Sequence, residues 1–131
     1  MQAEQAKTVE FKSVAPSFVV ADVVATAEYY RDVLGFEILG YFGEPTVFAI
    51  VARGGVEIHF GKADAEPQRS NLELRKISSD AYIWVNDVEA LFQELMASGA
   101  DIIEGPVRRI YDCVELEVRD CNGFKLVFSQ G

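Results

Sequence analysis

The stretch SFVVADV at residues 17–23 has a near copy further along the chain, YIWVNDV at residues 82–88. Each begins with an alternating run rich in β-branched and aromatic residues, which predicts a β-strand. Each ends in Asp-Val, where a helical spacing of apolar residues begins, so Asp22 and Asp87 are expected to cap a helix with their side-chain oxygens. The chain therefore contains one strand–helix unit written twice.

Three short strand signals follow each predicted helix, and a glycine-containing pair precedes the last strand of each half. These pairs, Gly54-Gly55 and Asn122-Gly123, are typical of hairpin turns. The strand signals cover residues 36–42, 46–52 and 56–60 in the first half and residues 100–104, 112–118 and 124–128 in the second. The pattern predicts an α+β fold in which a βαβββ module occurs twice.

The whole chain, residues 1–131, is expected to form one domain with four parts. An N-terminal arm that is mobile or contacts a partner covers residues 1–12, and the first βαβββ module covers 13–61. A polar linker containing a proline covers 62–78, and the second βαβββ module covers 79–131. A chain of this length is long enough to bury a substantial core.

Composition narrows the range of functions. Half of the 131 residues are hydrophobic and a quarter are charged, as in globular proteins. The net charge of −9 disfavours nucleic acid and anionic membranes as partners. No apolar run approaches the ~18 residues that span a bilayer, and nothing marks export, so a cytoplasmic location is expected.

Strand alternation sorts the side chains into two faces. Around the only histidine, His59, the apolar residues of 56–60 should pack under a helix, which leaves Glu57 and His59 on the opposite, open face. The same reasoning assigns to the open face Ser17, Asp80, Tyr82, Trp84, Glu115, Glu117 and Lys125. Aromatic walls with a few charges suit a ligand groove. The alternative is that Tyr82 and Trp84 fill a dimer interface.

Four stretches resemble the vicinal oxygen chelate superfamily, which includes glyoxalase I, extradiol dioxygenases, fosfomycin-modifying enzymes and bleomycin-resistance proteins. They are FVVADVVATAEYYRDVLGFEIL (18–39), VEIHFGKAD (56–64), IWVNDVEALFQELMASGA (83–100) and VRDCNGFKLVFSQ (118–130). The resemblance covers nearly the whole chain. It implies two βαβββ modules that form a cup-shaped mixed sheet, often completed by the partner in a homodimer.

Metal-dependent members of this superfamily place one ligand on each of four cup strands. Carried onto this chain, those positions fall at Ala15, His59, Asp80 and Val127. Ala15 and Val127 offer no lone pair, and two remaining ligands are too few for a catalytic zinc site, which uses three. The resemblance is therefore closest to the metal-free, bleomycin-resistance-like members. It implies no metal, no cofactor and no glyoxalase or dioxygenase activity.

Three functions follow as hypotheses. The first is an antibiotic-resistance protein without catalytic residues that sequesters a cationic or planar, antibiotic-like small molecule in a homodimer groove. Its expected ligand contacts are His59, Glu57, Asp80, Tyr82, Trp84, Ser17, Glu115, Glu117 and Lys125. The second is a metal-independent lyase, isomerase or hydrolase with His59 as general base and Asp80 beside it. The third is a structural or regulatory dimer with a vestigial cup.

A group of residues before the seventh strand, Arg108, Arg109 and Tyr111, is expected to lie in a solvated loop. Contact of these residues with a ligand at the rim of the groove is the alternative.

Overall fold

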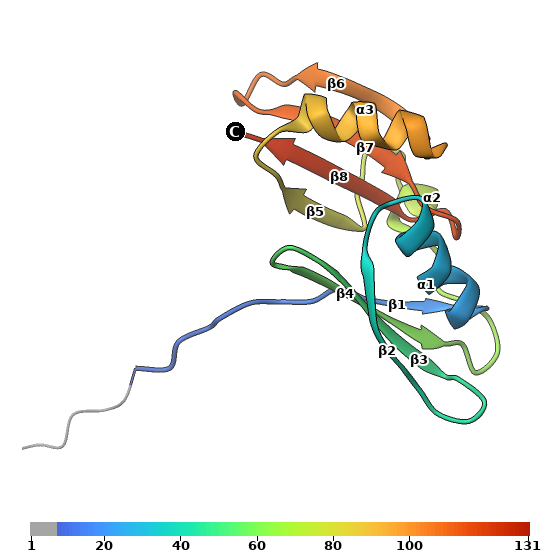
Figure 1. The fold of residues 1–131 in the computed structure, drawn as a ribbon. Coiled ribbons are helices and arrows are strands. Elements are labelled where there is room, and N and C mark those ends of the chain that lie inside the picture. The colour runs from blue at the N-terminus through green and yellow to red at the C-terminus, as the bar shows by residue number, and fades with distance from the viewer. Residues whose placement is uncertain (1–7) are drawn as a thin grey trace, which may run out of the picture.

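The computed structural model describes residues 8–131 and contains two βαβββ modules (Figure 1). The first comprises β1 (Ser17–Val20), α1 (Val23–Asp32), β2 (Glu37–Phe42), β3 (Phe48–Arg53) and β4 (Val56–Lys62). The second comprises β5 (Ala81–Trp84), α3 (Val88–Ser98), β6 (Asp101–Arg108), β7 (Val114–Arg119) and β8 (Lys125–Gln130). A short helix, α2 (Asn71–Leu74), lies in the linker. The predicted α+β fold class is confirmed.

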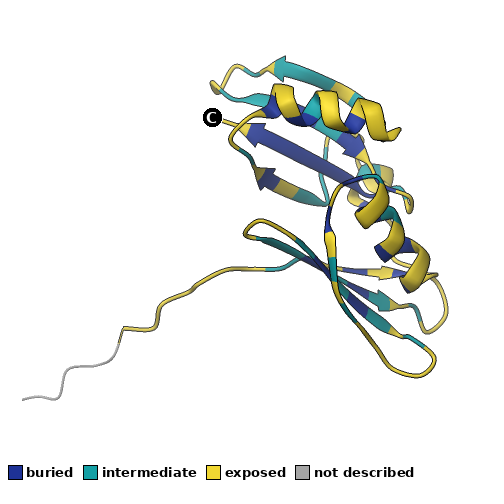
Figure 2. Ribbon diagram, in the orientation of Figure 1, coloured by how far each residue is buried: buried dark blue, intermediate teal, exposed yellow. Residues whose placement is uncertain are grey.

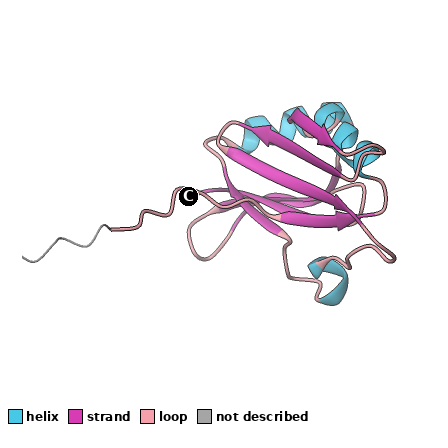
Figure 3. Cartoon of the chain, turned by 90° about the horizontal axis from the view of Figure 1, so that it is seen from below, coloured by secondary structure: helices cyan, strands magenta, loops and turns pink. Residues whose placement is uncertain are grey.

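Each module has its own four-stranded mixed sheet, in the order β1-β4-β3-β2 and β5-β8-β7-β6. The first pair in each is parallel and the others are antiparallel. The registers match, because Ser17 lies opposite His59 in the first sheet and Tyr82 lies opposite Val127 in the second. Seen from below, α1 and α3 lie on one side of the strands and α2 on the other (Figure 3). The sheets thus have a helix-covered face and an open face.

The repeated Asp-Val pairs start the two long helices, as predicted. The Asp22 carboxylate accepts a hydrogen bond from the Ala25 N–H at 3.0 Å, and the Asp87 carboxylate accepts one from the Ala90 N–H at 2.9 Å. Each bond satisfies one of the N–H groups that the first turn of a helix leaves without a partner. The two helices therefore begin at matching positions and cover their sheets in the same way.

Helix-side residues of both modules form one continuous core, and β8 is buried along most of its length (Figure 2). Phe18 of β1 stacks on Phe124 before β8, with ring centroids 4.4 Å apart. The fully buried Tyr30 hydroxyl donates to Asp120 at 2.6 Å. Burial raises the pKa of Asp120 and, together with that carboxylate, raises the pKa of Tyr30 well above its ordinary value. These contacts join the two modules.

The structure refines two predicted boundaries. The linker is not wholly irregular, because the Ser70 hydroxyl accepts from the Glu73 N–H at 3.0 Å and starts α2. Strand β6 runs to Arg108, so that residue ends a strand instead of lying in a loop. Of the predicted arm, residues 1–7 lie outside the described residues, and residues 8–12 are exposed without regular secondary structure. Across residues 8–131, the helices are too short or too polar to span a bilayer.

Candidate ligand-binding site

The open face of the first sheet carries the only histidine, paired with a glutamate. Ile58 and Phe60 of β4 are fully buried against the helix side, which leaves Glu57 and His59 half-buried on the open face, as predicted. His59 Nε2 lies 2.6 Å from a Glu57 carboxylate oxygen. The ring of Phe48 packs edge-on against the imidazole, with centroids 5.5 Å apart. Glu57 and Phe48 together fix the orientation of the imidazole ring.

Within the chain, Asp80 is not bonded to His59 but to backbone N–H groups. One Asp80 carboxylate oxygen accepts from the Asn71 N–H at 2.7 Å, and the other accepts from the Lys125 N–H at 2.9 Å. Both oxygens therefore serve the backbone, one at the start of α2 and one at the start of β8. Asp80 ties the linker to the second sheet.

The open face of the second sheet carries an extended charged network centred on Arg109. This guanidinium lies 2.9 Å from the Glu115 carboxylate, 3.0 Å from that of Glu117 and 2.7 Å from that of Glu104. The hydrogen bond to Glu115 raises the pKa of Arg109, so the guanidinium stays charged. Arg109 therefore binds three carboxylates from β6 and β7.

Glu115 is the most buried acid of this network, at 3% exposure. The hydroxyl of Tyr82 from β5 and the hydroxyl of Tyr111 both donate to one of its oxygens, the latter at 2.7 Å. Burial acts to raise the pKa of Glu115, but the bonds from the two tyrosines and Arg109 outweigh burial and hold it below its ordinary value. In return, the carboxylate raises the pKa of Tyr111 to about 12. Glu115 is ionised and fully bonded near neutral pH.

Lys125 completes the network on β8. Its side chain is 3% exposed, and its ammonium group lies 2.8 Å from the second oxygen of Glu117. Glu117 is thus bonded to Arg109 through one oxygen and to Lys125 through the other. The three acids of this network share two cations, Arg109 and Lys125, so each carboxylate has a cationic partner although the network keeps one negative charge in excess.

Aromatic side chains stand beside this network. Trp84 is 72% exposed, and its ring lies 4.9 Å from that of Tyr82 at an interplanar angle of 59°. A hollow of about 530 Å³ opens beside Tyr82, with Tyr111 and Val127 also contributing to its walls, whereas Trp84 lines a different hollow. Ser17, on β1 of the other sheet, is exposed on the open face opposite His59. The predicted site residues thus divide into three on the first sheet, Ser17, Glu57 and His59, and a cluster on the second sheet, while Asp80 bonds backbone N–H groups.

Sequence reasoning gave Arg109 and Tyr111 only a place at the rim, with a solvated loop as the default. They enter the network because the β6–β7 hairpin folds them back over β7, where the Arg109 N–H donates to the Cys113 carbonyl at 2.7 Å. The available signal was the spacing of Arg109 six and eight residues before Glu115 and Glu117. Across a hairpin turn, that spacing brings opposite charges onto one face.

The described residues do not fit a metal site. Within residues 8–131, no group of three or more His, Cys, Asp or Glu side chains is arranged to hold an ion. His59 Nε2 is bonded to Glu57, both Asp80 oxygens serve backbone N–H groups, and the matching position on β8 holds Val127. The donors that the superfamily's metal chemistry needs are therefore missing or already used.

The chain belongs to the Glyoxalase/Bleomycin resistance protein/Dioxygenase superfamily, whose family model matches residues 11–128. Among solved structures it is similar to TioX from Micromonospora sp. ML1, at 20% identity over 92% of this chain and 98% of that one, with a TM-score of 0.73. It is also similar to the bleomycin-binding protein of Streptomyces verticillus complexed with copper(II)-bleomycin. That match has 26% identity over 95% and 99% of the two chains and a TM-score of 0.70. No curated protein matches the chain.

Proposed function

We propose that this protein is a metal-free binding protein that sequesters a planar, antibiotic-like small molecule on the open face of its second module and releases it unchanged. The observation that carries the proposal is the 72% exposed Trp84, whose ring lies against that of Tyr82, a residue that lines the hollow of about 530 Å³. A large aromatic side chain is rarely left this exposed unless it meets a partner or ligand. The likeness to a bleomycin-binding protein supports the same role.

The paired acids favour planarity over positive charge as the feature recognised. Glu115 and Glu117 are each bonded to Arg109, and Glu117 is also bonded to Lys125. A cationic ligand at Glu115 or Glu117 would have to compete with these partners, whereas a planar ring can stack on Trp84 without disturbing them. Ligand contacts are therefore expected from Trp84 and Tyr82 first.

The proposal is tested by titrating bleomycin and a set of planar heteroaromatic antibiotics into the protein by calorimetry. Trp84→Ala is expected to weaken binding by about 2 kcal/mol, or about thirtyfold in Kd. The control is Met96→Ala, which removes a similarly exposed side chain, at 56%, from α3. Equal affinity in wild type and Trp84→Ala, or turnover of the bound compound, contradicts the proposal.

We propose further that the groove is completed in a homodimer, which acts in the cytoplasm and confers antibiotic resistance. Apolar side chains remain on the open face of the first sheet, where Val19 is 39% and Phe42 49% exposed, and Phe11 of the arm is 94% exposed. Light scattering after gel filtration is expected to give the mass of a dimer, and Phe42→Asp to give that of a monomer. A monomeric wild-type protein contradicts the dimer.

The second candidate function is a metal-independent lyase, isomerase or hydrolase that uses His59 as general base. The 2.6 Å contact of Nε2 with Glu57 favours it, because an imidazole held by a carboxylate through one nitrogen presents the lone pair of the other, here Nδ1. His59→Gln is then expected to abolish a measurable rate while the fold is kept. Chemical conversion of a bound compound that survives His59→Gln excludes this role.

A further inference from the structure

The seam between the two modules has two halves that the internal repeat relates to each other. Phe18 of β1 corresponds to Ile83 of β5, since Phe18 lies opposite Phe60 of β4 and Ile83 opposite Phe128 of β8. Val56, at the start of β4, likewise corresponds to the residue just before β8, Phe124. The same kind of contact can therefore be compared in the two halves.

One half of the seam is closed. Phe18 and Phe124 stack with centroids 4.4 Å apart and ring planes 13° from parallel. Beside them the Asn122 side chain, in the β7–β8 turn, donates to the Thr26 hydroxyl of α1 at 2.9 Å. The fold can thus fill this seam with two aromatic rings and tie the turn to the helix.

The other half of the seam is open and contains a hollow of about 380 Å³. Ile83 and Val56 stand where the other half has phenylalanines, and the β3–β4 turn is Gly54-Gly55 where the other half has Asn122-Gly123. A Cβ atom added at either Gly54 or Gly55 would meet nothing within 4 Å. Gly54 has a φ of +57°, at which a side chain would be strained, so the hollow results from the glycine turn together with the smaller side chains of Val56 and Ile83.

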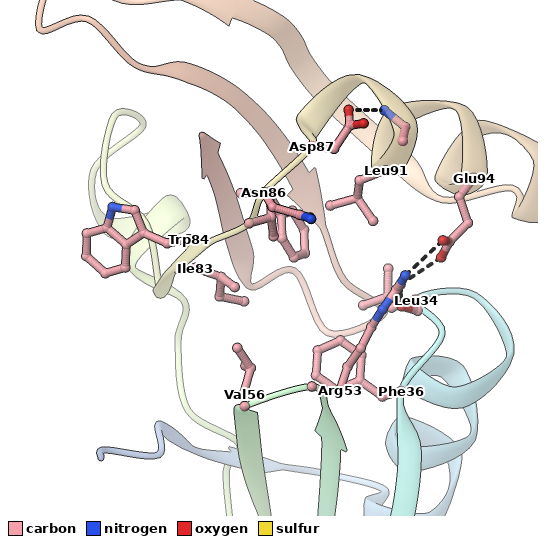
Figure 4. Close-up of a pocket in the computed structure, with 15 residues that line it drawn as sticks. Leu34, Phe36, Arg53, Val56, Ile83, Trp84, Asn86, Asp87, Leu91 and Glu94 are labelled. Atoms are coloured by element: carbon pink, nitrogen blue, oxygen red, sulfur yellow. Dashed lines mark hydrogen bonds and ion pairs between the residues drawn. The ribbon is translucent and has the colours of Figure 1, made fainter. Parts of the chain in front are cut away.

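The walls of this hollow are apolar and its rim carries a closed ion pair (Figure 4). Arg53 binds both carboxylate oxygens of Glu94, at 2.7 and 2.8 Å. The pair is bidentate, so the rim has opposite charges that satisfy each other. Largely buried residues form the walls: Leu34, Phe36, Ile83, Leu91 and Phe128.

We propose that this hollow, the open half-seam, binds a neutral aromatic molecule of one or two fused rings, at a site distinct from the hollow lined by Tyr82 and Tyr111, with Trp84 contributing to the lining of the half-seam. Its volume lies at the small end of the ~300–1,000 Å³ typical of ligand pockets. An aromatic ring is what the matched half of the seam accommodates in the Phe18–Phe124 stack. A charged molecule would compete with the bidentate Arg53–Glu94 pair, whereas a neutral one leaves it intact.

The first test uses indole and 2-naphthol as neutral probes and benzoate as the charged comparison. Methyl NMR spectra of the wild-type protein are expected to show saturable shifts at Val56, Ile83 and Leu91 with the neutral probes and none with benzoate. No saturable shift with either neutral probe, or a shift confined to the methyl groups of Val127 in the open-face hollow, overturns the proposal. Contacts from residues 8–14 of a second copy inside the hollow also overturn it, because that segment would then be the occupant.

The second test fills the hollow with the side chains of the closed half. The double variant Val56→Phe/Ile83→Phe is expected to weaken indole binding at least about tenfold, because its rings occupy the site. Ile110→Phe is the control, because it adds an aromatic ring at a fully exposed position of the β6–β7 hairpin, and it is expected to bind indole like wild type. Unchanged binding by the double variant contradicts the proposal. If that variant does not fold, Val56→Phe alone and the wild-type methyl shifts decide the outcome.

Discussion

The open faces of the two sheets share one backbone design and carry opposite chemistry. The registers match His59 of the first sheet with Val127 of the second. On the neighbouring strands, β3 and β7, Phe48 corresponds to Glu115 and Ile50 to Glu117. The first face thus has a histidine–glutamate pair among apolar residues, whereas the second is an ion-pair network with an apolar residue at the position of that histidine.

This contrast shows which part of the repeat the fold constrains. The helix-side residues of matched strands stay apolar, as in Ile58 of β4 and Leu126 of β8, both fully buried. The open-face residues do not pack under a helix, so their chemistry can differ between the two modules. The differences on the open face therefore carry the information about binding, and they can be tested one face at a time.

The largest expected effect is the loss of Arg109 from the second face. Arg109→Ala leaves the carboxylates of Glu115 and Glu117, which are mostly buried, without their shared cation. Breaking a buried pair in this way is expected to lower the free energy of unfolding by about 3 kcal/mol, measured by chemical denaturation.

The neighbouring arginine provides the control for this prediction. Arg108 pairs with Asp112 at 2.8 Å, but both side chains are highly exposed. Arg108→Ala is therefore expected to change stability by less than about 0.5 kcal/mol. If the two variants lose the same stability, the network on the second face does not hold the sheet together.

The next effect concerns the closed half of the seam. Tyr30→Phe removes the hydroxyl that donates to the buried Asp120 at 2.6 Å. The two backbone donors to Asp120, from Asn122 and Phe124, both bond its other oxygen, so the expected loss is that of an unsatisfied buried acceptor, about 1–3 kcal/mol. Tyr29→Phe, on the more exposed side of α1, is the control and should be near neutral. Equal losses would show that the modules do not depend on this bond.

A smaller effect is the pH dependence of stability, which differs between Glu115 on the second face and Asp120 at the seam. The pKa of Glu115 is lowered on folding, so its contribution to stability is present above its ordinary value of 4.5 and is lost as pH falls through the lower folded value. The pKa of Asp120 is raised, so its contribution has the opposite sign: stability is lost as pH rises from 3.8 through the folded value.

Denaturation between about pH 3 and 6 separates the two groups. Glu115→Gln is expected to flatten the loss of stability on acidification, because the group that releases its bonds on protonation is gone. Asp120→Asn is expected to steepen that loss, because the folded state no longer gains a proton. Parallel pH profiles for both variants and wild type would show that neither carboxyl group governs acid stability.

The sequence allows the fold and the faces to be predicted because both depend on short-range periodicity. The repeat located Asp22 and Asp87 at the helix starts, and strand alternation assigned Glu57 and His59 to the open face. The start of α2 at Ser70 was missed, although its Ser-x-x-Glu spacing is a capping signal.

Side-chain partners could not be predicted in the same way. Face assignment said that Asp80 was on the open side, but not that its oxygens would turn toward the N–H groups of Asn71 and Lys125. It also could not place Arg109, because a one-residue change in the hairpin register would move that side chain to the other face. Long-range geometry, not residue type, decides these contacts.

The smallest effect tests the first face. Glu57→Ala removes the partner of His59 in a pair whose side chains are 45% and 28% exposed, so the expected change in stability is at most about 0.5 kcal/mol. Nitrogen NMR of the imidazole should nevertheless show loss of the preference for a proton on Nε2, because Glu57 no longer accepts from it. A large loss of stability would give the first face the structural role that the network has on the second. An unchanged tautomer would mean that Phe48 packing alone orients the ring, and the general-base role of His59 would lose its positioning group.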